Sequence, residues 1–322
     1  MSIIRFLKDW TLPVSMATGT LLYLLFAGLP ALDGAANFFS PILAALFPVV
    51  MFMVLFVTFC KVDFRKMRPV RWHVRIALFQ LLMVALTTAA ILFFRMEGNG
   101  LILVEAVLTC MICPCAAAAP VVTVKLGGSL ENMTTYTFIS NFLTALLIPV
   151  VFPLVDSSIE LSFMESFLLI LRRVCIILLG PMILAYIVKH HLPWLHGRIL
   201  AVKDLSFYLW AVCLSIVTGT TVRNIAHAHT SALFLLLVAL SSLVLCLFQF
   251  YIGRKAGRGM NAVVECGQAL GQKNTAFAIW ISSSYLNPLS SVGPGCYILW
   301  QNTVNSIELW HHQKKGKGRN SR

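Results

Sequence analysis

The chain has 322 residues, of which 59% are hydrophobic and only 11% are charged. A soluble domain carries about 25% charged residues, so this composition excludes an ordinary soluble enzyme or binding domain and indicates an integral membrane protein. The net charge of +13 does not indicate nucleic-acid binding, because the basic residues gather in alternate loops between apolar segments.

Apolar segments fill nearly the whole chain, and each is long enough to cross a hydrocarbon core of about 30 Å. We therefore predict an all-α polytopic membrane protein with ten transmembrane helices. The predicted spans are 11–29, 40–60, 74–94, 101–124, 133–154, 166–188, 205–222, 232–252, 261–285 and 289–309.

The loop at 155–160 separates five predicted spans from five others, so the two halves would enter the membrane with opposite orientations. We interpret residues 1–157 and 158–310 as two inverted five-helix repeats. Residues 311–322 form a basic tail that we place in the cytoplasm. No linker indicates a second, soluble domain.

The placement of charge predicts the orientation of the chain. Only Arg95 and Arg223 fall on one side, Arg172, Arg173 and Lys273 fall within spans, and the rest of the 25 Lys and Arg residues lie on the other side. By the positive-inside rule both termini are cytoplasmic. We expect a multi-pass protein of the plasma (inner) membrane, with the lipid bilayer as a partner and no nucleic acid.

Two short stretches interrupt the fourth and ninth spans, Ile112-Cys-Pro-Cys-Ala-Ala-Ala-Ala-Pro120 and Gly271-Gln-Lys-Asn-Thr275. Pro114 and Pro120 each remove a backbone donor and disturb the preceding turn, and Gly271 weakens the ninth span. Broken helices at corresponding positions of two inverted repeats typically mark a substrate site. For the first stretch alone, a kink with close packing of small residues is the alternative.

Lys273 is the most informative charge, because an ammonium near the middle of a span costs about 2.5–3.5 kcal/mol on insertion scales. It needs a partner, which could be freed backbone carbonyls, a carboxylate or an anionic substrate. Neighbouring polar side chains add donors and acceptors around the same turn. The predicted substrate-binding residues are Gln80, Thr123, Gln272, Lys273, Asn274 and Thr275.

The remaining polar residues indicate no other chemistry. Glu105 lies near the outer end of its span and is interpreted as interfacial. Cys110, Cys113 and Cys115 could offer thiolates to a soft ion, although cysteine is also an ordinary small residue of packed helices. Since no nucleophilic triad, P-loop or pair of catalytic carboxylates is recognisable, we predict no enzyme activity, no cofactor and no resident metal.

The two interruptions carry a resemblance to a known family. The stretch Cys113-Pro-Cys-Ala-Ala-Ala-Ala-Pro-Val-Val-Thr123 is similar to Pro-Gly-Gly-Thr-Ala-Ser-Asn-Val-Met-Thr, the fourth-helix motif of the bile acid/sodium symporter family. Ala269-Leu-Gly-Gln-Lys-Asn-Thr275 is similar to its ninth-helix motif, Glu-Val-Gly-Met-Gln-Asn-Ser. The resemblance implies a core bundle that contains the crossed breaks and a panel that moves against it.

The departures from these motifs concern sodium. The resemblance implies sodium ligands at four positions that here hold Ala119, Pro120, Ala269 and Lys273. Sodium is a hard cation that needs several oxygen ligands, so we predict a member that lacks the usual sodium ligands and is not sodium-coupled. The Lys273 ammonium would occupy roughly the space of the missing ion.

The resemblance also implies a function, secondary transport of a small organic anion by alternating access. A buried cation beside half-helix ends attracts negative charge and independently favours such a substrate. Two alternatives stay open. One is an arsenite-type metalloid efflux carrier with Cys113 or Cys115 as thiol ligand, and the other is a non-transporting membrane sensor or scaffold.

Overall fold

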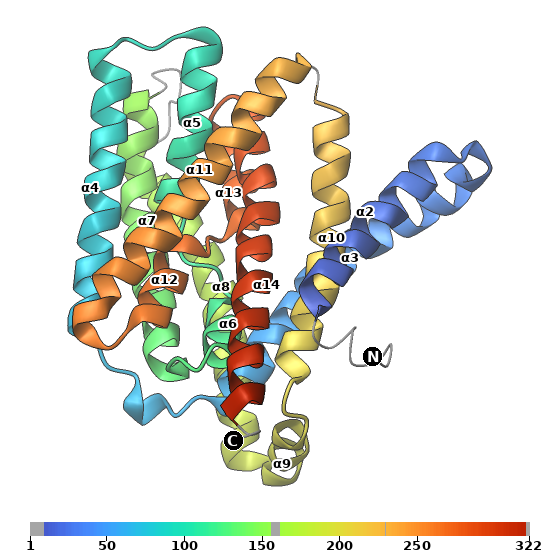
Figure 1. Ribbon diagram of the computed structural model, residues 1–322, viewed down its shortest axis with the longest axis vertical. Helices are drawn as coiled ribbons and strands as arrows, with labels where there is room; N and C mark the ends of the chain where they lie inside the picture. The colour runs from blue at the N-terminus through green and yellow to red at the C-terminus, as the bar shows by residue number, and fades with distance from the viewer. Residues whose placement is uncertain (1–9, 156–161, 229, 320–322) are drawn as a thin grey trace. The chain divides into compact units, whose positions relative to one another are not determined.

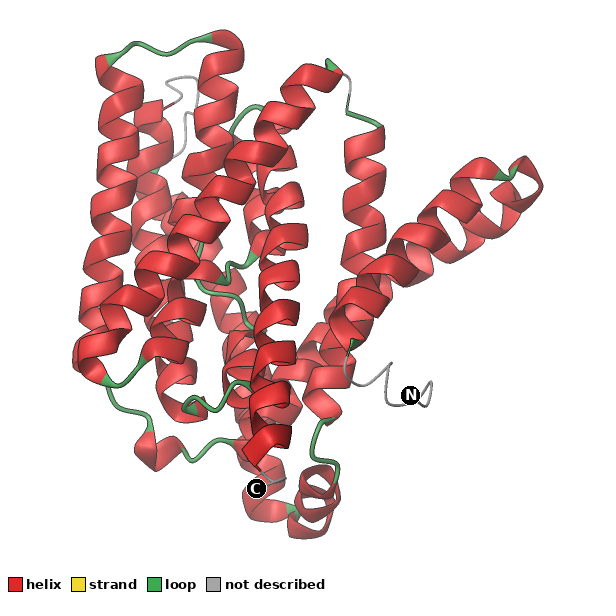
Figure 2. Ribbon diagram, viewed as in Figure 1, coloured by secondary structure: helices red, strands yellow, loops and turns green. Residues whose placement is uncertain are grey.

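The computed structural model describes residues 10–155, 162–228 and 230–319. These residues are overwhelmingly helical, and within them no strand is found (Figure 2). Arg5 and Lys8, the predicted boundary between the repeats at 157/158, and the last three residues of the basic tail lie outside these ranges.

The helices follow one another with short connections (Figure 1). Four short 3-10 turns join some of them: η1 (Pro30–Leu32), η2 (Phe64–Lys66), η3 (Arg258–Met260) and η4 (Pro288–Ser291). The α-helices are α2 (Thr11–Gly28), α3 (Asp33–Lys61), α4 (Arg71–Phe93), α5 (Gly98–Ile112), α6 (Ala119–Lys125), α7 (Leu130–Val155), α8 (Phe163–His191), α9 (Pro193–Ala201), α10 (Leu205–Ala226), α11 (Ala232–Gly257), α12 (Val263–Gly271), α13 (Thr275–Tyr285) and α14 (Val292–Arg319).

By length and composition, seven helices of the described chain could each cross a membrane. They are Thr11–Gly28, Pro30–Lys61, Arg71–Phe93, Leu130–Val155, Met164–His191, Leu205–Ala226 and Ala232–Met260. The protein is therefore all-α and polytopic, as predicted. The count of ten spans and the inverted repeats stay predictions.

The other three predicted spans coincide with helices of a different kind. Two of them are the broken pairs α5/α6 and α12/α13, and no half reaches the 20 or so residues that a span requires. The third coincides with α14, a helix that continues from the apolar segment into the basic tail.

The chain forms two compact units, each assembled from separate stretches of sequence. The first contains the residues up to Val62, Pro181–His227 and the residues from Asn302 onward. The second contains Asp63–Gly180 and Ala228–Gln301, and so holds both broken helices. Each unit draws helices from both predicted repeats.

In the first unit, α10 packs against α2 and α3. The approach of α2 to α10 is close, because a Cβ on Gly19 would overlap the backbone of Ser215. The Ser215 hydroxyl donates to the Ser15 carbonyl at 2.9 Å across the same contact. Small residues thus bring the two backbones together, as is common between helices in membranes.

In the second unit, α11 and α12 lie side by side and are joined by the turn at η3 (Figure 1). Gly253 of α11 faces the Cys266 backbone of α12 so closely that no Cβ fits between them. α4 packs on α5 and α7, and α6 packs on α7. This arrangement surrounds the two helix breaks with protein.

Candidate functional site: the crossed helix breaks

The two breaks cross each other inside the second unit. The Ala116 N–H donates to the Gln272 carbonyl and the Asn274 N–H donates to the Pro114 carbonyl, both at 2.9 Å. These two bonds form an isolated antiparallel bridge between Cys115 and Lys273. Backbone groups that leave a helix in a membrane need internal partners, and here each break supplies partners for the other.

Proline and glycine set the limits of the breaks. α5 ends at Ile112, two residues before Pro114, and α6 begins at Ala119. Pro120 therefore lies in the first turn of α6, where its missing N–H removes no intrahelical bond. Helix α12 ends at Gly271. This residue lies so close to Phe250 of α11 that a Cβ would overlap the ring.

The last carbonyls of α5 are capped by side chains from other helices. Lys273 Nζ donates to the Met111 and Cys113 carbonyls, each at 3.2 Å. Gln80 Nε2 donates to the Ile112 carbonyl at 3.2 Å and to the Cys113 carbonyl at 3.3 Å. The Thr144 hydroxyl donates to the Ile112 carbonyl at 2.8 Å. A cation at a helix C-terminus is also favoured by the helix dipole.

The Gln301 side chain bonds both backbone groups of Lys273. The Lys273 N–H donates to Gln301 Oε1 at 2.8 Å, and Gln301 Nε2 donates to the Lys273 carbonyl at 3.2 Å. The Lys273 side chain is only 1% exposed. Among the residues that the structure describes, no carboxylate forms an ion pair with it, so the ammonium is balanced by backbone dipoles.

Two further groups complete the second break. The Tyr297 hydroxyl donates to the Gly271 carbonyl at 2.8 Å. Asn274 caps α13, because its Oδ1 accepts from the Phe277 N–H at 3.2 Å. Thr275, the first residue of α13, is buried. These contacts make the crossing a rigid junction rather than a loose loop.

Beside the junction, the positions of Ala119 and Ala269 lie in one apolar cluster. Both side chains are fully buried, and Cys115, Cys266 and Met133 belong to the same cluster. A hard cation such as sodium requires several oxygen ligands, and the two alanine methyl groups offer none. Ala119 and Ala269 themselves therefore supply no side-chain oxygen to a cation.

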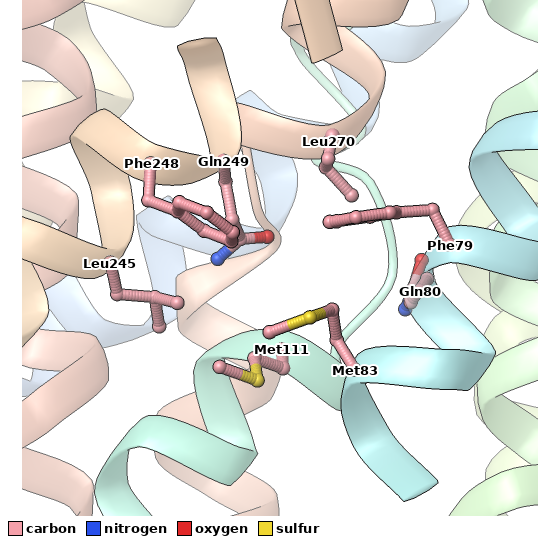
Figure 3. Close-up of a pocket in the computed structure, with 8 residues that line it drawn as sticks. All are labelled: Phe79, Gln80, Met83, Met111, Leu245, Phe248, Gln249 and Leu270. Atoms are coloured by element: carbon pink, nitrogen blue, oxygen red, sulfur yellow. The ribbon is translucent and has the colours of Figure 1, made fainter. Parts of the chain in front are cut away.

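A small cavity lies next to the junction, between α4, α5, α11 and α12. Figure 3 shows Gln80 and Gln249 beside it, together with Met111. Its free volume is about 10 Å³, which is room for about one water molecule. Ligand pockets usually measure about 300–1,000 Å³, so this space is too small for an organic anion.

Several buried amide atoms around the junction have no hydrogen-bond partner in the described chain. They are both polar atoms of Gln272, Gln80 Oε1 and Gln249 Nε2. Gln272 is 0% exposed and stands directly at the crossing. An unpaired buried polar group costs about 1–3 kcal/mol, so an amide left open at this position points to a ligand or a water.

The structure gathers most, but not all, of the predicted site residues. Gln80, Gln272, Lys273, Asn274 and Thr275 lie at the junction. Thr123 does not take part in the contacts that close it. The Thr123 carbonyl accepts from the Gly128 N–H at the turn after α6. At the same turn, Glu265 Oε1 accepts a hydrogen bond from the Ser129 N–H.

Sequence reasoning missed four residues that close the junction: Ser140, Thr144, Tyr297 and Gln301. Their polar character inside apolar spans was the available signal. The interfacial position of Glu105 stays a prediction; its side chain is 2% exposed, and its Oε2 accepts from the Ser290 hydroxyl at 2.6 Å. Burial arises because η4 covers this part of α5.

The cysteines gain no support as ligands of a soft ion. Cys110, Cys113 and Cys115 are buried. Over the described ranges, no group of three or more His, Cys, Asp and Glu side chains is arranged to hold a metal ion. Cys113 and Cys115 act in the junction through their backbone, as acceptor and bridge partner.

Comparison with known protein families gives one match. Residues 48–228 match the family described as the sodium bile acid symporter family. The chain belongs to the sodium bile acid symporter family. The match spans more than half of the sequence and includes the first helix break. A search of curated proteins finds no match.

Membership of the symporter family indicates what kind of protein contains the crossing. Proteins of this family are transporters, so the chain is a multi-pass membrane transporter of the bile acid/sodium symporter type. The matched residues end before the second break. The family assignment therefore does not depend on Lys273 or its neighbours. The geometry around Lys273 is an observation independent of that assignment.

Proposed function

We propose that this transporter carries a small organic anion by alternating access and does not couple transport to sodium. The observation that carries the proposal is the position of the Lys273 ammonium, within 3.2 Å of the Met111 and Cys113 carbonyls. A permanently attached cation at the end of α5 makes a bound metal cation unnecessary there. The ammonium also disfavours binding of a metal cation, because the two positive charges would repel each other at the same carbonyls.

The apolar cluster around Ala119 and Ala269 also supports transport without sodium. Ala119 and Ala269 stand where the family resemblance implies a hydroxyl and a carboxylate, and both are fully buried among apolar groups. In this proposal, hydrocarbon takes the place of one cation and the Lys273 ammonium takes the place of the other.

Charge supports an anionic substrate. The buried ammonium of Lys273 has no carboxylate partner within the described ranges, so the junction carries a net positive charge. The Gln272 amide, which has no partner within the described residues, can donate to a carboxylate oxygen. Two compact units, of which one holds the crossing, supply the separate bodies that alternating access requires.

The test is uptake of radiolabelled carboxylates and steroid acids into proteoliposomes, with and without an inward sodium gradient. We expect uptake by the native protein that sodium does not change. Lys273→Gln should abolish this uptake or make it depend on sodium, because it removes the tethered charge and restores the family's residue. Lys255→Gln, the same change at an exposed position, should behave as the native protein.

Three results would overturn the proposal. Sodium-driven uptake by the native protein would exclude the sodium-independent mechanism. Saturable binding of an anion without flux would instead favour the sensor or scaffold alternative. Arsenite transport that is lost on changing Cys113 or Cys115 to serine would favour the metalloid carrier.

A further inference from the structure

The helix α9 (Pro193–Ala201) is an unusual element of the first unit. It is a short separate helix between α8 and α10 (Figure 1), in a stretch that the sequence predicts as a loop. None of its residues is buried. Its Trp194 is 66% exposed, and the flanking Leu192 and Val202 are each 48% exposed.

One face of α9 is nevertheless fixed to the protein. His196 Nε2 donates to the Cys60 carbonyl at 2.8 Å, at the end of α3. Lys61 Nζ donates to the Lys203 carbonyl at 2.7 Å, which ties the end of α3 to the segment after α9. Helix α9 also packs against α3. The outward face of α9 therefore has a defined direction.

The outward face presents an aromatic ring and a cation together. The Arg198 guanidinium lies 4.4 Å from the centre of the Trp194 ring, one helical turn away. Tryptophan is enriched where a protein meets the membrane interface. Arginine beside it can cover apolar surface while its charged end stays at the headgroups.

The surroundings of this pair are basic. Lys189 Nζ donates to the Val62 carbonyl at 3.4 Å, so the ends of α8 and α3 meet close to α9. We name Lys61, Lys189, Arg198 and Lys203 the α9 basic cluster. Between Lys189 and Leu205, Asp204 is the acidic residue, so the segment keeps a positive charge.

We propose that α9 and the α9 basic cluster form a binding site for an anionic phospholipid of the membrane leaflet on their side. Trp194 lies at the level of the glycerol and upper acyl chains, and Arg198 with the neighbouring lysines binds the phosphate headgroup. Both helices that α9 connects, α8 and α10, are long and apolar enough to cross the membrane. Their connection therefore lies at the membrane surface, where α9 can reach the lipid.

The experiment uses the full-length protein in nanodiscs of phosphatidylcholine with increasing phosphatidylglycerol, and counts bound lipids by native mass spectrometry. A basic residue near an anionic membrane surface strengthens lipid binding about fivefold. Arg198→Gln should therefore weaken phosphatidylglycerol binding by about that factor. Raising the salt concentration should reduce this difference. The matched control is Arg223→Gln, an exposed arginine at the opposite end of α10, which should change nothing.

A second measurement tests the position of the aromatic ring. Subtracting the fluorescence of Trp194→Phe from that of the native protein isolates Trp194, and lipids brominated near the glycerol should quench it. An unquenched Trp194, equal phosphatidylglycerol binding by the Arg198→Gln variant, or an equal loss in Arg223→Gln would each overturn the proposal. None of these outcomes depends on which substrate is transported.

Discussion

Replacing Lys273 by methionine tests whether the ammonium stabilises the crossing. Methionine keeps the length of the side chain and removes its charge and donors. The Met111 carbonyl then loses the partner that Lys273 Nζ supplies, whereas the Cys113 carbonyl keeps the Gln80 amide at 3.3 Å. The perturbation therefore falls mainly on the last turn of α5.

The magnitude follows from two opposing terms. The two hydrogen bonds from a charged donor are worth about 1.5–3 kcal/mol each, or about 3–6 kcal/mol together. Against this, the native protein bears the cost of burying an ammonium, about 2.5–3.5 kcal/mol. The midpoints of these two ranges, about 4.5 and about 3 kcal/mol, predict that Lys273→Met lowers the free energy of unfolding by about 1.5 kcal/mol.

Thermal unfolding in one lipid composition measures this loss as a fall of a few degrees in the midpoint. The control is Lys255→Met, because Lys255 is exposed at the end of α11 and the same chemical change there should leave the midpoint unaltered. A Lys273→Met protein as stable as the native one, or more stable, would refute the reasoning. The buried ammonium would then be a net cost retained for another purpose.

Two further substitutions test the packing and the backbone of the junction. Gly271→Ala should destabilise the protein by about 1–3 kcal/mol, because the new Cβ meets the Phe250 ring. Adding Phe250→Leu should recover part of that loss, and an unshifted midpoint for Gly271→Ala alone would contradict the close approach. Gln301→Leu leaves the Lys273 N–H without its acceptor, so hydrogen exchange at that amide should accelerate about fivefold or more, in line with a loss of about 1–3 kcal/mol. Unchanged exchange would show that another group accepts this N–H.

The sequence predicted the breaks because proline and glycine act locally. Pro114 removes a donor whatever its surroundings, and a lysine inside an apolar span demands a partner. Freed carbonyls were one of three partners considered for Lys273, and the structure shows carbonyls. Local chemistry was therefore enough to locate the junction.

The closing residues could not be predicted in the same way, because their role depends on which helices become neighbours. Thr144 and Gln301 are separated by more than 150 positions from one another, and each sits in an ordinary span. Only the packing of α7 and α14 around the breaks gives them partners. Helix α9 escaped prediction for a different reason, since nine residues are too few for a helical pattern to stand out.

A tethered cation also has a consequence for the energetics of transport. A bound sodium ion can leave the protein, so its gradient can drive a cycle, whereas Lys273 Nζ remains attached. If no other ion takes part, each turnover moves the charge of the anion alone. A membrane potential of 100 mV is worth about 2.3 kcal/mol per charge.

This predicts that accumulation of a monovalent anion changes about 50-fold for each 100 mV of imposed potential. An inside-positive potential should raise accumulation and an inside-negative one should lower it, with potassium and valinomycin setting the value. Symport with one sodium ion or proton would be electroneutral, so accumulation that ignores the potential would refute uncoupled transport. In that event, a dependence on the sodium or pH gradient would identify the coupled ion, and only a sodium dependence would contradict the role assigned to Lys273.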